Sequence, residues 1–341
     1  MSHVTFPSIL ERLEAGELGP EGVRAAFDAM LDGAWSSVQI ASFATALRLR
    51  GEDEDTLVAA ASALRAAMSR VDHGLSAVLD TCGTGGDGAG TVNVSTAAAV
   101  LVASLGVPVA KHGNRSVSSR SGSADVLEAL GLPLDVPPER QAGILAEVGI
   151  AFLLAPLHHP ALRHASQARR ELGIRTIFNA LGPLANPARA THQLLGVYDD
   201  AIRGRMARAL ARLGVRRAWV VRSEDGLDEL SPSAPTRVSA LGEDGAVVER
   251  VVQPEDFGLP RAPLSSLAGG DPGENALALA TLFRGEPHPA TPAVLLNAAA
   301  ALHVATGEPL PEAASRVGEA HREGRAATLF HAWKRAAEAS R

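Results

Sequence analysis

The sequence predicts an α/β protein with a small N-terminal helical domain and a larger domain built on a mostly parallel central sheet. Two observations support this fold class. Roughly the first 70 residues show helical periodicity and no strand pattern, and from Ala77 onward short apolar runs alternate with helical stretches. Strand–helix alternation is typical of a parallel sheet covered by helices, and 341 residues allow about two structural units.

Helical signals come first along the chain. Ser36-Ser37 is expected to cap a helix that stops at Gly51, and a second helical pattern runs from Asp55 to Met68. The apolar residues of the first helix recur at i, i+3, i+4 and i+7: Ile40, Phe43, Ala44 and Leu47. We therefore expect residues 1–72 to form the helical domain and the large domain to begin at 73.

The strands and helices of the large domain follow in alternation. The expected parallel strands are Ala77–Thr81, Val107–Ala110, Ile150–Ala155, Leu194–Val197 and Ala218–Arg222. The expected helices between them include Thr96–Leu105, Ala124–Leu130 and Pro138–Val148. Arg237–Leu241 and Val247–Val252 flank the turn signal Glu243-Asp244-Gly245, so we expect a hairpin there, followed by Ala-rich helices.

Composition excludes several classes of protein. A net charge of −6 provides no global positive field for nucleic acid or an anionic membrane. Cys82 is the single cysteine, which excludes an internal disulfide framework and a CxxC metal site. The first residues have no basic segment followed by an apolar one, and the longest apolar run, Thr96–Ala110, is too short to span a bilayer. We expect a cytoplasmic protein.

A glycine-rich segment, residues 80–87, follows the first expected strand. Gly83, Gly85 and Gly86 permit backbone N–H groups to approach an anion closely. Asp87 at the edge of such a loop would repel a phosphate unless a cation lies between them, which implies Mg²⁺. Taken alone, the segment is equally consistent with an ordinary glycine turn bearing an exposed aspartate.

Two further segments strengthen the phosphate-binding interpretation. Residues 93–96 open a helix, whose first N–H groups and dipole favour an anion. Residues 111–123 place three basic residues and five serines around two glycines, and Lys111 is one of only two lysines in the chain. Three such elements at strand ends suit a ligand with two separated phosphate groups. GxxxxGK[ST] spacing does not occur, which disfavours a P-loop NTPase.

These motifs together resemble the anthranilate phosphoribosyltransferase family. The resemblance covers nearly the whole chain and rests on GTGGD at 83–87, NVST at 93–96, KHGNRSVSS at 111–119, GSADVLEALG at 122–131, the HHPALRHASQARRELGIRTIFNALGPLANPA segment at 158–188, QLLGVYD at 193–199, EDGLDEL at 224–230 and GGDPGENA at 269–276. It implies a nucleoside phosphorylase/phosphoribosyltransferase-like fold, a homodimer formed through the helical domain, and Mg²⁺, with two ions per site. It also implies that about 169–187 completes the helical domain, leaving 73–168 and 188–341 as the large domain.

The resemblance also implies roles for individual residues. The phosphoribosyl pyrophosphate site would comprise Gly83, Gly86, Asp87, Thr91, Asn93, Val94, Ser95, Thr96, Lys111, His112, Gly113, Asn114, Arg115, Ser116, Val117, Ser118, Ser119 and Ser123. Anthranilate would contact Gly83, Asn114 and Arg169, with His112, His159 and Pro183 lining its approach. The Mg²⁺ ligands would be Ser95, Asp228 and Glu229, with Asp87 near one ion.

Several of these residues have simpler interpretations. By composition alone Asp228-Glu229 is a solvated acidic loop, and Arg169 lies on a helix where an exposed charge is common. His158-His159 does not predict a metal site, because adjacent histidines point apart and no third ligand spacing follows. No residue is assigned as an obligatory acid or base, since an aryl amine is already neutral at pH 7.

Two other functions fit the same scaffold. A pyrimidine nucleoside phosphorylase would use inorganic phosphate and a nucleoside, which leaves the paired acidic residues without a purpose. A non-catalytic nucleic-acid-binding relative would need a basic groove and a damaged metal site. The expected function is therefore transfer of a phosphoribosyl group from phosphoribosyl pyrophosphate to anthranilate in tryptophan biosynthesis.

Overall fold

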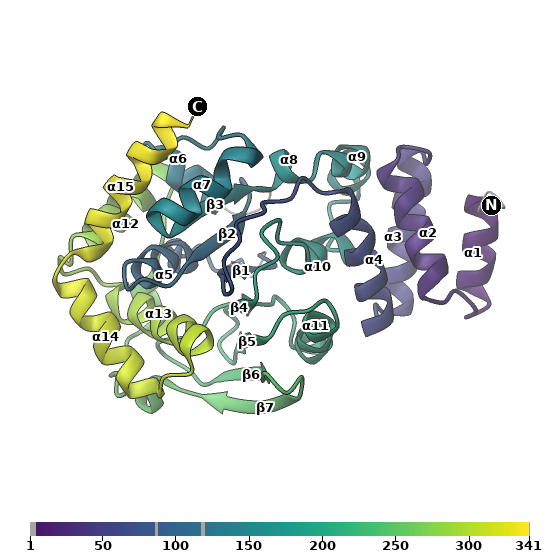
Figure 1. The fold of residues 1–341 in the computed structure, drawn as a ribbon. Coiled ribbons are helices and arrows are strands. Elements are labelled where there is room, and N and C mark those ends of the chain that lie inside the picture. Colours follow the sequence, from purple (N-terminus) through teal and green to yellow (C-terminus); the bar gives the residue numbers. More distant parts are fainter. Residues whose placement is uncertain (1–4, 86–87, 117–119, 341) are drawn as a thin grey trace.

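The computed structural model describes residues 5–85, 88–116 and 120–340. These residues form a seven-stranded sheet with helices on both faces, and a group of N-terminal helices lies at one side of it (Figure 1). The predicted fold class, a helical part followed by an α/β part with a mostly parallel sheet, is confirmed.

Four helices make up the N-terminal group: α1 (Phe6–Glu14), α2 (Pro20–Leu31), α3 (Ser37–Arg50) and α4 (Glu54–Ala67). Helix α3 begins as the sequence predicts. The Ser36 hydroxyl accepts a hydrogen bond from the Gln39 amide at 3.3 Å, and the Gln39 side chain accepts one from the Ser36 amide at 2.9 Å. The helix ends at Gly51, whose φ of +90° favours glycine.

The strands are β1 (Leu79–Gly83), β2 (Val109–Gly113), β3 (Ile150–Leu154), β4 (His192–Gly196), β5 (Arg217–Ser223), β6 (Thr236–Leu241) and β7 (Val247–Val252). They lie in the order β3-β2-β1-β4-β5-β6-β7, with β6 and β7 antiparallel. The β6–β7 hairpin is as predicted, but β1 and β2 run further than the apolar pattern indicated, to Gly83 and Gly113. Both glycines still belong to the parallel ladder, where Gly83 pairs with Gly196.

Eleven further α-helices occur among the described residues: α5 (Val94–Ala103), α6 (Ser123–Ala129), α7 (Pro138–Val148), α8 (Ala155–His158), α9 (Arg163–Leu172), α10 (Ile177–Leu184), α11 (Asp200–Arg212), α12 (Pro272–Phe283), α13 (Thr291–Thr306), α14 (Leu310–Arg322) and α15 (Arg325–Ala339). Short 3₁₀ turns lie at Pro160–Leu162, Pro254–Phe257 and Leu264–Leu267.

Two large apolar cores lie on opposite faces of the sheet. Leu194 and Val221 point into the core with α5 and α12–α15, whereas Leu195 and Val220 point into the core shared by α10, α11 and the N-terminal helices. This alternation follows from the two-residue period of a strand. Helix α9 packs on α2 and α3, and α10 packs on α3 and α4.

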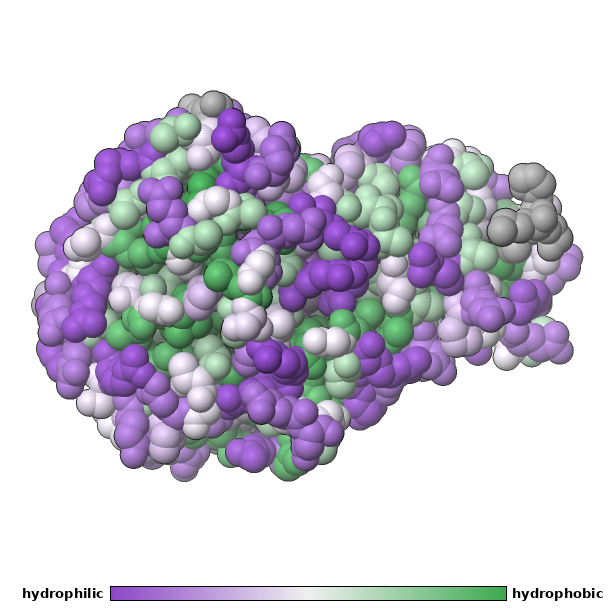
Figure 2. All heavy atoms as spheres, viewed as in Figure 1, coloured by the Kyte–Doolittle hydropathy of each residue, from purple (hydrophilic) through white to green (hydrophobic). Residues whose placement is uncertain are grey.

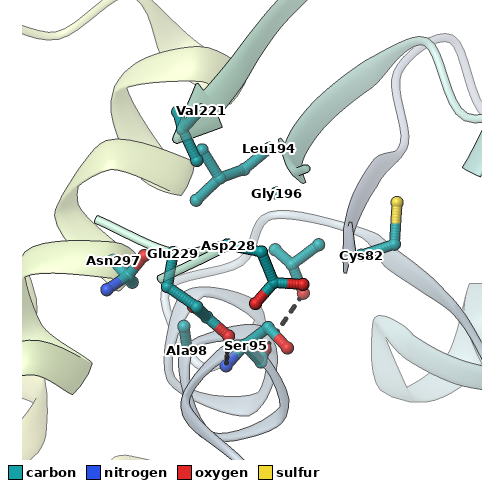
Figure 3. Close-up of a pocket in the computed structure, with 10 residues that line it drawn as sticks. Cys82, Ser95, Ala98, Leu194, Gly196, Val221, Asp228, Glu229 and Asn297 are labelled. Atoms are coloured by element: carbon teal, nitrogen blue, oxygen red, sulfur yellow. Dashed lines mark hydrogen bonds between the residues drawn. The ribbon is translucent and has the colours of Figure 1, made fainter. Parts of the chain in front are cut away.

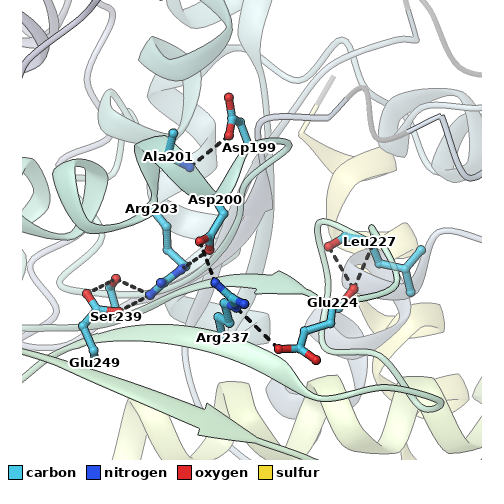
Figure 4. A network of polar contacts seen from close by, with 10 residues as sticks. Asp199, Asp200, Ala201, Arg203, Glu224, Leu227, Arg237, Ser239 and Glu249 are labelled. Carbon is cyan, nitrogen blue, oxygen red and sulfur yellow. Dashed lines mark hydrogen bonds and ion pairs between the residues drawn. The ribbon is translucent and has the colours of Figure 1, made fainter.

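The antiparallel edge of the sheet is tied to α11 by a polar network (Figure 4). The Arg203 guanidinium contacts the Asp200 carboxylate at 2.7 Å, the Ser239 hydroxyl at 2.6 Å, and Glu249. Arg237 on β6 contacts Asp200 at 3.3 Å and Glu224 at 3.5 Å. Glu224 is the first residue after β5, so the network also reaches the start of the acidic loop.

Hydrophilic side chains cover most of the face shown in Figure 2, with apolar ones scattered between them. Within the described ranges, no helix has the length and apolar character needed to cross a membrane.

Candidate active site

The candidate site lies where the carboxyl ends of β1, β4 and β5 meet. Strands β1 and β4 are neighbours, yet the chain leaves β1 toward β2 on one side and enters β5 from β4 on the other. Ligands of open α/β sheets bind in such a crevice. A small pocket here is lined by Thr81, Cys82, Ser95, Ala98, Leu194, Gly196, Val221, Asp228, Glu229 and Asn297 (Figure 3).

Asp228 and Glu229 extend from the β5–β6 loop toward Ser95 at the start of α5 (Figure 3). The Gly85 amide donates to the Asp228 carboxylate at 3.1 Å, and the Ser95 amide donates to the Glu229 carboxylate at 3.2 Å. Both carboxylates are half-buried, and buried Leu227 precedes them. The interpretation as a solvated acidic loop is therefore wrong, because tertiary contacts draw the pair inward.

Two glycines permit this close approach. A Cβ on Gly196 would lie 1.5 Å from the Asp228 carbonyl oxygen, and one on Gly83 would lie 3.0 Å from the Asp228 carboxylate. The sequence motifs contained both glycines, but only Gly83 was expected in the site. Gly196 had no role until the fold placed it against the acidic loop.

Lys111 is buried beneath the same crevice. Its ammonium donates to the Thr81 carbonyl and lies 3.4 Å from the Ser95 hydroxyl. Burial lowers the pKa of Lys111, and the negative charge of nearby Asp80 opposes that shift. The lysine therefore links β1, β2 and the start of α5 with one charged group.

Asp80 holds the neighbouring strand ends together. It is fully buried and accepts hydrogen bonds from the His112 amide at 3.1 Å and the Asn186 amide group at 2.8 Å. Burial raises the pKa of Asp80, while the Asn186 hydrogen bond and Lys111 act to lower it. This network fixes the end of β2, from which Asn114 continues.

The loop before α5 is braced by the GGDPGENA segment. Thr91 pairs with Ala268, and the Gly269 amide donates to the Gly90 carbonyl at 2.8 Å. The Asn275 side chain donates to the Asn93 side chain at 3.0 Å. Asn275 was not predicted as a site residue, although its motif was part of the resemblance. Val94 and Thr96 are buried and anchor α5 behind this loop.

The loop after β2 closes on Asp125. The Asp125 carboxylate accepts from the Ser116 amide at 2.8 Å and the Gly122 amide at 2.9 Å. Arg115, expected among phosphate donors, instead pairs with Glu128 at 2.5 Å and lies at the surface. Asn114 is exposed next to it, and Ser123 begins α6. Five predicted residues lie outside the described ranges: Gly86, Asp87, Val117, Ser118 and Ser119.

Three histidines lie near the end of β2: His112, His158 and His159. The His112 and His159 rings are 5.1 Å apart, and His112 Nδ1 lies 3.0 Å from the Gly182 carbonyl, next to Pro183 in α10. His158 points instead to the Ser69 carbonyl at 2.9 Å, as expected for adjacent histidines. Burial lowers the pKa of His112 well below its ordinary value and that of His159 to about 4.

Arg169 lies on α9 with its guanidinium 5.6 Å from the centre of the Phe178 ring. Partial burial lowers the pKa of Arg169, whereas Arg170 is exposed. Phe178 belongs to α10, the helix that carries Gly182 and Pro183. The predicted carboxylate-binding arginine therefore belongs to the same pair of helices that reaches His112.

The structure thus joins a group of helices to an α/β domain whose strand ends carry loops suited to binding anions, and this arrangement indicates a glycosyl transferase. A model of the helical bundle domain of a glycosyl transferase family matches residues 7–68, and the model of its α/β domain matches 75–327. The chain belongs to this family and, within it, to the anthranilate phosphoribosyltransferases.

Individual relatives support the narrower assignment. An anthranilate phosphoribosyltransferase of Myxococcus xanthus is 54% identical over 275 residues, 81% of either chain. The structure of the Thermus thermophilus enzyme is 42% identical with a TM-score of 0.91, covering 97% of this chain and 99% of that one. The Saccharomyces cerevisiae enzyme in complex with PRPP and Mg is 29% identical with a TM-score of 0.91, covering 99% of both chains. The yeast enzyme also has a structure with 4-fluoroanthranilate.

Proposed function

We propose that this chain transfers the phosphoribosyl group of 5-phosphoribosyl 1-pyrophosphate to the amino group of anthranilate, giving N-(5-phosphoribosyl)anthranilate and pyrophosphate in tryptophan biosynthesis. The proposal rests on the pair Asp228-Glu229. The Gly85 amide holds the first carboxylate and the Ser95 amide holds the second, next to the loops expected to bind phosphate. A nucleoside phosphorylase would not need a cation site at this position.

The acidic pair fits Mg²⁺. Two carboxylates and the Ser95 hydroxyl are oxygen donors, which Mg²⁺ prefers. No group of three or more His, Cys, Asp or Glu side chains among the described residues could hold a metal. Mg²⁺ commonly uses one or two carboxylates and completes its shell with phosphate oxygens and water. We assign Ser95, Asp228 and Glu229 as ligands, with Asp87 near one ion.

Phosphoribosyl pyrophosphate would lie across the three loops. The parts of these loops that the structure describes lie at the carboxyl ends of β1 and β2 and at the start of α5. Arg115 contributes to this site through its backbone, since its side chain pairs with Glu128. Lys111 supplies a fixed positive charge beneath the ligand.

Anthranilate would enter between the strand ends and α9–α10. Arg169 would bind its carboxylate, and Asn114, Gly83, His112, His159 and Pro183 would surround the ring. The low pKa values of His112 and His159 keep both imidazoles neutral at pH 7, so they do not repel a cationic ribose. A planar guanidinium that is partly desolvated suits bidentate binding of a carboxylate.

The chemical step needs charge stabilisation more than proton transfer. The aryl amine is a neutral nucleophile, so no residue needs to act as a general base. Mg²⁺ bound to the pyrophosphate would neutralise the charge of that leaving group. The chain's own part is to hold the amine in line with the ribose carbon, to donate N–H groups toward the phosphates, and to exclude water.

The direct test is to mix the protein with anthranilate, phosphoribosyl pyrophosphate and Mg²⁺ and to follow the loss of anthranilate fluorescence. Asp228→Asn and Glu229→Gln should lower turnover at limiting Mg²⁺. Phosphorolysis of thymidine or uridine is the competing activity. Phosphorolysis without anthranilate consumption would refute the proposal.

We further propose that residues 169–187 complete the helical domain, that two copies associate through it, and that the enzyme is cytoplasmic. Val38 and Leu49 on α3 are 73% and 83% exposed, so this domain presents apolar side chains to solvent. Leu49→Glu should shift the molar mass measured by light scattering toward a monomer. Leu277→Glu, at a 73% exposed site on α12, is the matched control and should not. A dimer unaffected by Leu49→Glu would exclude that face of α3.

A further inference from the structure

The acidic pair lies in a long connection, residues 224–235, between β5 and β6. Connections of this length are often mobile unless side chains fix them. Leu227 and Leu230 are each 1% exposed and flank the pair on both sides. Two polar side chains outside the pair fix the backbone at these leucines.

Asp225 joins the two arms of the connection. Its carboxylate accepts hydrogen bonds from the hydroxyls of Ser223, Ser231 and Ser233, each at 2.5 Å. Ser223 ends β5, whereas the other two serines lie on the returning arm before β6. The Ser223 hydroxyl also accepts from the Leu227 amide at 2.9 Å. The Asp225 carboxylate therefore fixes the backbone that leads into Asp228 and Glu229.

Asn297 fixes the other side of the pair from α13. Its side-chain oxygen accepts from the Leu230 amide at 3.0 Å, and its side-chain nitrogen donates to the Leu230 carbonyl at 2.9 Å. Asn297 is 1% exposed and lies beside Glu229 (Figure 3). A buried amide that satisfies both polar groups of one residue is a rigid attachment, because breaking it leaves those groups unpaired.

We propose that Asp225 and Asn297 are positioning residues for the cation site: they hold Asp228 and Glu229 in register with Ser95 without touching the cation. The inference rests on the proposed function of that pair. Groups that orient ligands commonly affect metal affinity 10- to 100-fold, because a preorganised ligand set need not be ordered on binding. Loss of either residue should weaken cation binding and leave the binding of anthranilate unaffected.

The test is Asp225→Ala, with Asp225→Asn as the conservative variant and Asp244→Ala as the matched control. Asp244 also fixes a turn, accepting from the Ala246 amide at 3.0 Å, but in the β6–β7 hairpin. Mn²⁺ binding in the presence of phosphoribosyl pyrophosphate is measured by electron paramagnetic resonance. The Mg²⁺ dependence of turnover and both Michaelis constants are measured alongside.

We expect Asp225→Ala to weaken Mn²⁺ binding and to raise the Mg²⁺ requirement, each by about tenfold or more. Turnover at saturating Mg²⁺ and the Michaelis constant for anthranilate should stay within about threefold. Asp225→Asn should recover part of the loss, and Asp244→Ala should match the native protein. Native Mn²⁺ binding in the alanine variant would overturn the proposal, as would an equal loss for anthranilate.

Asn297→Leu removes both hydrogen bonds to Leu230 without adding a charge beside Glu229. It should shift Mn²⁺ binding in the same direction, and it provides the test if Asp225→Ala does not fold. Absence of Mn²⁺ binding by the native protein with phosphoribosyl pyrophosphate would overturn the inference. A native protein that binds Mn²⁺ but does not consume anthranilate would refute the proposed function alone.

Discussion

At the scale of single residues, two cations near the proposed site are withdrawn from solvent and two are not. Lys111 and Arg169 are desolvated, whereas Arg170 and Arg115 are exposed. Arg169 has no ion pair among the described residues, so an anionic ligand would restore the interaction that its guanidinium loses on desolvation.

Arg169→Ala should raise the Michaelis constant for anthranilate steeply and that for phosphoribosyl pyrophosphate much less. Loss of a charge-assisted contact at a desolvating site costs roughly 2–4 kcal/mol, or about 30- to 1000-fold in specificity. Arg170→Ala changes the exposed neighbour and should have little effect. Aniline, which lacks the carboxylate, should be a poor substrate for the native enzyme and lose little more in the variant. Equal losses for both amines would assign Arg169 to the fold.

Lys111→Ala should raise the Michaelis constant for phosphoribosyl pyrophosphate by about tenfold or more, because a buried positive charge beneath the phosphates is lost. The constant for anthranilate should change little. Lys334, the other lysine of the chain, is the natural control, since Lys334→Ala changes a helix far along the sequence. Steady-state kinetics decide the matter, and an unchanged constant for phosphoribosyl pyrophosphate would contradict the assignment.

At the scale of elements, the ends of β1 and β4 position the residues of the proposed active site. Strands β1 and β4 end in the paired glycines Gly83 and Gly196, and the β5–β6 connection packs directly on them. A side chain at Gly196 would displace the backbone of the acidic loop, whereas one at Gly83 would press only on the Asp228 carboxylate.

Gly196→Ala should therefore lower activity by about 100-fold or more, because a shift of about 1 Å in catalytic groups can cost that much. Its Cβ would meet the Asp228 carbonyl at 1.5 Å. Gly143→Ala in α7 is the matched control: apart from the helix's own backbone, no atom of the described residues lies within 4 Å of the added Cβ. That change should leave activity intact and stabilise the protein by up to about 1 kcal/mol. Full activity in Gly196→Ala would show that the loop has room to move.

At the scale of the whole molecule, the buried histidines couple stability to pH. Burial lowers the pKa of both His159 and His192 to about 4, below the ordinary 6.5. Between these values the unfolded chain binds protons that the folded chain does not. Stability is thus fully present above pH 6.5 and is lost as pH falls toward 4.

The melting temperature should therefore fall between pH 7 and pH 5. For His159 the expected loss at pH 5 is about 2 kcal/mol. His159→Gln should reduce the pH dependence, whichever way it changes the melting temperature itself. His331→Gln removes an exposed histidine and should leave the dependence as it is. Differential scanning calorimetry at a series of pH values measures the slope, and identical slopes in all three proteins would contradict the prediction.

The sequence by itself determined the fold class, the capped helix α3, the β6–β7 hairpin and the loops that belong to the site. Those features follow from periodicity, caps and turn residues, which act over a few neighbouring positions. The family motifs extended this to a list of residues, whose individual roles remain predictions.

Only the tertiary structure decided which of these groups meet. Gly85 and Asp228 are 143 positions apart, and Ser95 and Glu229 are 134 apart. Such contacts depend on strand order and register, which no local pattern specifies. The same is true of Gly196, Asn275 and Asn297, whose importance arises from packing against distant backbone. Composition alone indicated a solvated loop for the acidic pair, and its half-buried state comes instead from flanking leucines and distant amides.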